Sequence, residues 1–498
     1  MLPDKLTLLF ITKTQFQQMK VLKEIKDGAV SIKKLEDEMD LTKRQVRKII
    51  QNLMNEYEES GFSKKYQTSL ILDKDKLLCI PQLTDTEYLE LINIFQERYF
   101  AESNLYQTLL YVLEKRKFSV SDIAKYLIYS ESHVYKLLGK LKELFRLLKI
   151  DLRLTKINET LIELTGSEST IRMLHYLGIA VISKGNYWLF KTITQEEVND
   201  LRLSINFDHY ENLSPLGKKR INYLLAVGLI SLKNGYQIDD LPLELVELGV
   251  TIYNEEIDAC LDQLTVKKVM DAANSRNECI HFAFLSNYFA QDLHTKEEKE
   301  KLGRKLAELK KNSIVSSCKK LLMCMIEYFH IPETIFYRLL YYLTNKLVTI
   351  HHLELYKFMP IYHDALPKNN YGTYIERCID KSLKSYQNQH SFNHIKNSFV
   401  QVVLGSLASN SLKSEHKVYV EFFNLPESKN IVENIITHYY NSKRIKIVES
   451  YHHADIVISD THGYEDKELF YFKHILDKES WTRLGSYFNK IIVNTYKF

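Results

Sequence analysis

Apolar residues near the N-terminus recur with the period of a helix, in two segments separated by a short turn. Ser31 is a suitable cap for the first segment, and Thr42 with Gln45 predicts a capping box at the start of the second. A short helix, a turn at 40–41 and a second amphipathic helix are typical of a helix-turn-helix unit. The inward positions of the two helices are Leu35, Met39, Val46, Ile49, Ile50 and Leu53.

The outward face of the second helix is basic. Residues 41–50 hold four basic residues and no acidic one, which suits contact with DNA phosphates. Arg44 or Arg47 has the donors to pair with guanine, and Gln45 suits adenine. The residues of this helix predicted to bind DNA are Thr42, Lys43, Arg44, Gln45, Arg47 and Lys48.

The same arrangement recurs from Ser119. A short helix with the small Ala124 at its close contact precedes a second helix capped by Ser130. Val134, Leu137, Leu138 and Leu141 are expected inside. The DNA contacts predicted on its outward side are Ser130, Ser132, His133, Tyr135, Lys136 and Lys140.

Each predicted unit is followed by a segment that alternates apolar and polar residues. Residues 150–166, with a turn at 158–159, predict a β-hairpin, and 68–80 predict a comparable pair of strands. We interpret the first of these as the wing of a winged helix, whose Arg153 and Lys156 follow the DNA backbone. The alternative is that the hairpins are β-ribbons of the core. One such unit also occurs in plain helical bundles, but two together favour DNA binding.

The rest of the chain changes character twice. Residues 167–400 are dominated by helical periodicity, whereas the last 85 or so alternate apolar runs, typical of buried parallel strands, with two helices. The fold class is therefore multidomain and mainly α, with a C-terminal α/β domain. The predicted domains are 1–82, 83–167, 168–292, 293–400 and 414–498.

This order of units resembles the Mga-like family of virulence and global transcriptional regulators (Mga, AtxA and relatives). The segment Leu164–Glu168, followed by Ile171 and Arg172, is similar to the family's junction after the second winged helix. The resemblance implies two winged helix-turn-helix units, two phosphotransferase-system regulation domains (PRD-like modules) and an enzyme IIB-like domain. It also implies binding to A·T-rich promoter DNA. We expect a homodimer or higher homo-oligomer, with HPr or other sugar phosphotransferase-system proteins as further partners.

The resemblance further implies phosphohistidines in the helical modules. Gly228, and Tyr341 or Tyr342, stand where the family pattern places a histidine. The remaining candidates are His209, His281, His351 and His352, for each of which a hydrogen-bonded structural histidine is the favoured alternative. The His351–His352 pair lacks a third ligand at metal-binding spacing, so no metal site is expected.

The C-terminal domain departs from the enzyme IIB-like pattern at its reactive loop. Such a phosphotransferase carries a nucleophilic cysteine after its first strand, in a loop whose N–H groups cradle the phosphoryl group. Here the loop spans 422–428, no cysteine follows Cys378, and Pro426 removes one N–H donor. We therefore expect this domain to serve dimerisation or contact with another protein.

Composition and charge limit the remaining functions. The 498 residues are 45% hydrophobic and 26% charged, with a formal net charge of +4, so any nucleic-acid surface must be local. Six cysteines without a CxxC pair, no signal peptide and no long uncharged stretch lead us to expect a cytoplasmic protein. No Walker loop, GxGxxG or HExxH is present. We therefore expect neither an enzyme nor a cofactor. The rival functions are an RNA-binding PRD antiterminator and a scaffold of the sugar phosphotransferase system that does not bind DNA.

Overall fold

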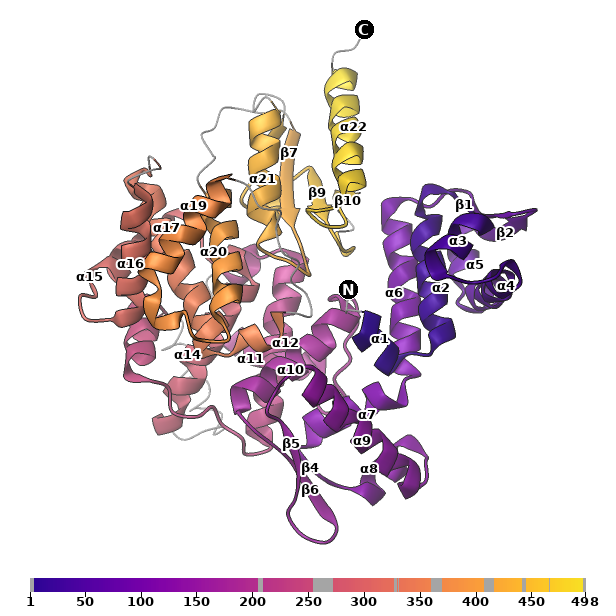
Figure 1. Ribbon diagram of the computed structural model, residues 1–498, viewed down its shortest axis with the longest axis horizontal. Coiled ribbons are helices and arrows are strands. Elements are labelled where there is room, and N and C mark those ends of the chain that lie inside the picture. The colour runs from indigo at the N-terminus through magenta and orange to yellow at the C-terminus, as the bar shows by residue number, and fades with distance from the viewer. Residues whose placement is uncertain are drawn as a thin grey trace.

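The computed structural model is mostly helical, with three small sheets among the residues that it describes. Figure 1 shows the N-terminal elements on one side of the molecule, the helices α15 to α17 on the other and the C-terminal α/β part between and above them. The structure describes residues 4–204, 209–253, 272–326, 329, 331–359, 370–406, 416–440, 445–464 and 466–495.

The first unit has the predicted helix, turn and helix. The Ser31 hydroxyl accepts a hydrogen bond from the N–H of Lys34, and Asp40 ends the first helix in the left-handed conformation with φ 52°. Val46, Ile49, Ile50 and Leu53 are buried, as their spacing predicts. The elements are α1 (Asp4–Phe10), α2 (Lys13–Glu24), β1 (Ala29–Ser31), α3 (Ile32–Met39), α4 (Lys43–Glu59), α5 (Phe62–Tyr66), β2 (Ser69–Asp73) and β3 (Lys76–Ile80).

The second unit repeats this order of elements. Both predicted hairpins are present, but each is joined by a third strand of three residues that the sequence pattern does not reveal. The strands β1 and β4 pair antiparallel with β3 and β6, and three residues are too few to show an alternation. The elements are α6 (Asp85–Ala101), α7 (Asn104–Lys115), β4 (Lys117–Ser119), α8 (Val120–Leu127), α9 (Glu131–Leu147), β5 (Arg153–Lys156) and β6 (Leu161–Thr165).

The middle of the chain is helical, as predicted. Helices α10, α12 and α14 pack in sequence, and α17 lies against α15, α16 and α20. The end of α17 continues into a π-helical turn at Val348–His352. The helices are α10 (Glu168–Ser183), α11 (Gln195–Ser204), α12 (Pro215–Lys233), α14 (Ala272–Phe289), α15 (Lys296–Glu308), α16 (Ser313–Ile326), α17 (Glu333–Leu347), α19 (Asn370–Ser382) and α20 (Phe392–Ser406).

The C-terminal part contains the predicted parallel sheet, with strand order β10-β9-β7-β8. Its core is formed by residues such as Val418, Val420, Ile456 and Ile458. The elements are β7 (His416–Glu421), α21 (Ser428–Tyr439), β8 (Ile445–Ile447), β9 (Ile456–Ser459), β10 (Glu468–Tyr471) and α22 (Lys478–Thr495). No helix among the described residues is both long and apolar enough to cross a bilayer.

Buried polar contacts join this α/β part to the helices. Arg220 of α12 pairs with Glu421 of β7 at 3.3 Å and donates to the carbonyl oxygen of Phe422. Lys346 of α17 lies 2.8 Å from Glu427, which precedes α21. Because an unpaired charge is costly to bury, these pairs hold the α/β part in one position against α12 and α17.

Candidate nucleic-acid interface

The basic face of α4 is exposed, and half of its charge is paired with the turn between β2 and β3. Lys43 Nζ lies 2.7 Å from Asp75 Oδ2, and Arg47 Nη2 lies 3.0 Å from Asp75 Oδ1. Arg47 also donates to the carbonyl oxygen of Lys74 at 3.1 Å. Among the described residues, Arg44 and Lys48 make no ion pair with a carboxylate. These two side chains therefore face solvent as ready phosphate ligands.

Asp75 ties the basic helix to the hairpin. Hydrogen bonds from Lys43 and then Arg47 lower the pKa of its carboxyl below the ordinary value. All three side chains are half exposed, so water screens the pairs and they contribute little to folding. A DNA phosphate that approaches α4 would compete with Asp75 for the same two cations.

Gln45 is occupied by the predicted capping box. Its Oε1 accepts from the N–H and the hydroxyl of Thr42, both at 2.9 Å. The sequence correctly predicts this cap and also assigns Gln45 to adenine, although the same oxygen cannot serve both partners fully. Reading of a base by Gln45 requires the side chain to leave the cap.

Helix α9 presents a second exposed surface. Ser130 caps it by accepting from the N–H of His133 at 3.3 Å, and its outward residues Ser132, Tyr135, Lys136 and Lys140 are exposed. His133, predicted to face outward with them, is less exposed than these four residues. Its side chain is half-buried because the ring packs against Tyr129, with the ring centroids 4.6 Å apart.

The turn before α9 carries exposed residues that the sequence pattern does not predict. Ile128 is 90% exposed and adopts a left-handed conformation, with φ 58°, while Tyr126 and Tyr129 are 42% and 43% exposed. A β-branched residue is rare at positive φ. A tyrosine hydroxyl can donate to a phosphate oxygen, so both tyrosines extend the candidate surface. The sequence does carry a sign of this surface, because residues 126–129 are apolar or aromatic at a turn where polar residues are expected.

The hairpin β5–β6 projects from the body of the molecule, as Figure 1 shows. Arg153 is highly exposed, and its Nη2 lies 3.1 Å from the exposed carboxylate of Asp151. Lys156 is exposed near the tip, beside Ile157. Arg153 and Lys156 are therefore both accessible to a groove or a phosphate backbone of DNA.

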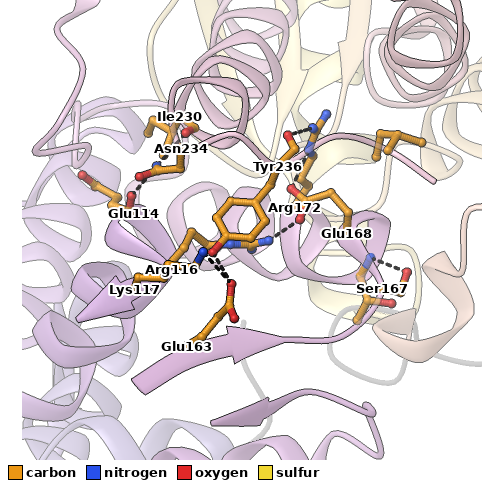
Figure 2. A network of polar contacts seen from close by, with 12 residues as sticks. Glu114, Arg116, Lys117, Glu163, Ser167, Glu168, Arg172, Ile230, Asn234 and Tyr236 are labelled. Carbon is orange, nitrogen blue, oxygen red and sulfur yellow. Dashed lines mark hydrogen bonds and ion pairs between the residues drawn. The ribbon is translucent and has the colours of Figure 1, made fainter. Parts of the chain in front are cut away.

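A buried network connects the second unit to the helices that follow (Figure 2). Glu168 binds Arg116, which precedes β4, and also Arg172, at 2.9 Å. Arg172 in turn contacts Glu278 of α14 at 2.5 Å. The Arg116 guanidinium lies 4.4 Å from the centre of the Tyr236 ring. This chain of alternating cations and carboxylates connects the start of β4 to α10 and α14.

The start of α10, directly after the hairpin β5–β6, contacts α14 and the segment that follows α17. The Ser169 hydroxyl lies 3.0 Å from His281 Nε2 of α14 and donates to the carbonyl oxygen of Leu353. Thr170 donates to Glu354 at 2.6 Å. Two consecutive residues shortly after the hairpin therefore connect α10 to α14 and to the segment after α17.

The four candidate phosphohistidines occupy different environments. His281 is buried, and burial followed by the nearby Arg172 lowers its pKa to about 3. His351 Nδ1 lies 2.7 Å from the Ser391 hydroxyl, and burial followed by His351 lowers the pKa of His352 to about 4. His209 has a side chain that is 36% exposed, with its Nε2 3.3 Å from Glu298. His209 is therefore partly exposed to solvent, whereas His281 is enclosed.

The loop after β7 already holds an anion from its own chain. The Asp460 carboxylate accepts from the N–H of Phe423 at 2.6 Å and from the N–H and side-chain amide of Asn424 at 3.0 and 2.6 Å. These are donors that a phosphoryl-binding loop would use. The Asp460 carboxylate therefore occupies donors that a bound phosphoryl group would need. The loop also lacks a cysteine.

One comparison with known proteins identifies part of the chain. Residues 90–177 match the Mga helix-turn-helix domain family, which covers most of α6, then α7 to α9, the hairpin β5–β6 and the first part of α10. This match is consistent with a Mga-like regulator. No curated protein matches the chain. The matched segment contains α9 and lies outside α4, although α4 carries the more basic face.

Proposed function

We propose that the chain is a DNA-binding transcriptional regulator of the Mga type, acting without catalysis of its own. The observation that carries this proposal is the exposed face of α9, capped by Ser130, within the segment that matches the Mga helix-turn-helix domain. The like-built α3–α4 pair supports a second contact with the same duplex.

In this mechanism α4 and α9 enter adjacent major grooves. Lys and Arg contacts to phosphates supply most of the affinity, and the hairpin residues Arg153 and Lys156 follow the backbone. Arg44 is the side chain best placed to read a base, because it is exposed and unpaired among the described residues. A·T-rich sites suit such binding, since their shape is read without many base contacts.

Regulation is proposed to act through the helical modules. A phosphoryl group on His209 would meet the carboxylate of Glu298, which lies 3.3 Å away, and like charges would repel. A change in the helical modules would reach the hairpin β5–β6 through the buried contacts that α10 makes with α14 and with the segment after α17. Self-association, with the C-terminal α/β part as the contact, would let two copies span a long promoter. The scaffold without DNA binding remains the alternative function.

A salt titration of binding to A·T-rich duplex DNA by fluorescence anisotropy tests the proposal. The log of the affinity should fall with the log of the salt concentration by about 0.9 per phosphate neutralised. Arg44→Ala/Lys48→Ala should weaken binding and flatten the slope. Lys301→Ala/Lys305→Ala removes the same charge from α15 and should change neither. Absence of binding by the unchanged protein at low salt would favour the scaffold.

A further inference from the structure

Two histidines and a glutamate lie close together between the segment before α12 and the start of α15. His209 precedes the turn before α12, His294 follows the turn after α14, and Glu298 lies in the first turn of α15. Each offers one ligand atom, and these atoms all lie within 4.8 Å of one another. The histidines are far apart in sequence, so spacing alone does not reveal the group.

The separation of His209 and Glu298 also fits two ligands of one ion. His209 Nε2 and Glu298 Oε1 are 3.3 Å apart. That is close to the ~3.3 Å between two ligand atoms of a tetrahedral ion with bonds of about 2.0–2.1 Å. A single ion pair needs one imidazole, whereas here a second imidazole, that of His294, also has a ring nitrogen within 4.8 Å of the Glu298 carboxylate. Since the three atoms lie within 4.8 Å of one another, a contraction of up to about 1.5 Å would bring all of them to one ion.

Neighbouring groups orient the ligands. The N–H of Thr295 donates to Glu298 Oε2 at 2.8 Å, which leaves Oε1 directed to His209. The ring of Tyr253 lies parallel to that of His294, with an interplanar angle of 7°. Such outer contacts hold ligands in place around metal ions in proteins. Partial exposure of His209 and Glu298, at 36% and 31%, provides an entry path.

We propose that His209, His294 and Glu298 form a binding site for a divalent transition-metal ion, with Zn²⁺ as the best-suited ion. Two imidazoles and one carboxylate, without a thiolate, match the ligand preferences of Zn²⁺ and leave one position for water. The ion would tie the segment before α12 to the start of α15, and metal binding and the proposed phosphorylation of His209 would exclude each other. Asp292, two residues before His294, pairs with Lys429 of α21 at 2.7 Å. The bound ion would therefore also stiffen the connection that holds the C-terminal part.

Calorimetric titration of the chelator-treated, tag-free full chain with Zn²⁺ tests the site. We expect one Zn²⁺ per chain. Glu298→Gln should lower the affinity at least about tenfold, while its amide oxygen still accepts from Thr295 and preserves the helix start. His209→Ala should do the same. His390→Ala removes an exposed histidine elsewhere and should leave binding unchanged.

Two further readouts separate lost ligation from a lost fold. Zn²⁺ should raise the Tm of the unchanged protein and of His390→Ala, but not that of Glu298→Gln. Co²⁺ should give the visible absorption of a tetrahedral site, lost in both ligand variants. The proposal is overturned if the unchanged protein binds no Zn²⁺ at one per chain, or if Glu298→Gln binds it equally well.

Discussion

Lys43 Nζ lies 2.7 Å from Asp75 Oδ2, so the turn between β2 and β3 neutralises part of the basic face of α4. Arg47 shares the same carboxylate. In the proposed complex this acid should lower non-specific affinity, because the two cations would have to exchange the carboxylate for a phosphate. An arrangement of this kind favours ligands that offer phosphates on both sides of Asp75.

Asp75→Asn should therefore strengthen DNA binding. The substitution releases Lys43 and Arg47 and removes a negative charge from the interface, so we expect an affinity gain of about threefold to tenfold at low salt. The salt slope should steepen by about one phosphate. Asp200→Asn makes the same change of charge on α11, where Asp200 is exposed, and should have no effect. Equal affinities for Asp75→Asn and the unchanged protein would place α4 away from the DNA.

Gln45→Glu should separate folding from binding. A glutamate at this position keeps the capping box with Thr42, so the free energy of unfolding should stay within about 0.5 kcal/mol. DNA affinity should fall, because a carboxylate now faces the phosphates. Gln45→Ala, in contrast, should lose about 1 kcal/mol of stability through the cap. Denaturant unfolding beside anisotropy measures both quantities, and a parallel loss of both in Gln45→Glu would contradict the assignment.

Breaking the buried network should destabilise the chain strongly. Glu168→Gln leaves Arg116 and Arg172 without their shared carboxylate in a buried site. Loss of one partner from a buried ion pair costs about 3–5 kcal/mol. Tyr236→Phe removes only the hydroxyl that donates to Glu163 at 2.6 Å and should cost about 1 kcal/mol. Urea unfolding should rank the two variants in this order, and a reversed order would mean that the network is open to water.

Stability should decrease as the pH falls below about 6.5. Burial, followed by the charge of Arg116, lowers the pKa of His175 to about 3, and His281 has a pKa of about 3 through burial and Arg172. Between these values and the unfolded value, the unfolded chain binds protons that the folded chain does not. Each histidine then contributes up to about 1.4 kcal/mol of lost stability per pH unit. His281→Gln should flatten the measured decline, and an unchanged slope would show that His281 is hydrated.

Local patterns allowed much of the fold to be predicted. Caps such as Ser31 and Ser130, and buried positions such as Val46 and Leu141, depend on neighbours within a turn or two, so sequence spacing reveals them. The pairing of β1 with β3 and the contact of Asp75 with Lys43 depend on chain closure over many residues. No spacing rule covers them. His133 shows the same limit, because its partial burial depends on the ring of Tyr129 across the turn, which the helical period does not reveal.

Asp460 has a consequence for how the C-terminal part senses its surroundings. The loop donors of Phe423 and Asn424 are bonded to a carboxylate that the chain carries permanently. A free inorganic phosphate would have to compete with a tethered anion whose local concentration it can hardly match. Changes in the concentration of free phosphate should therefore leave the contacts of this loop unchanged.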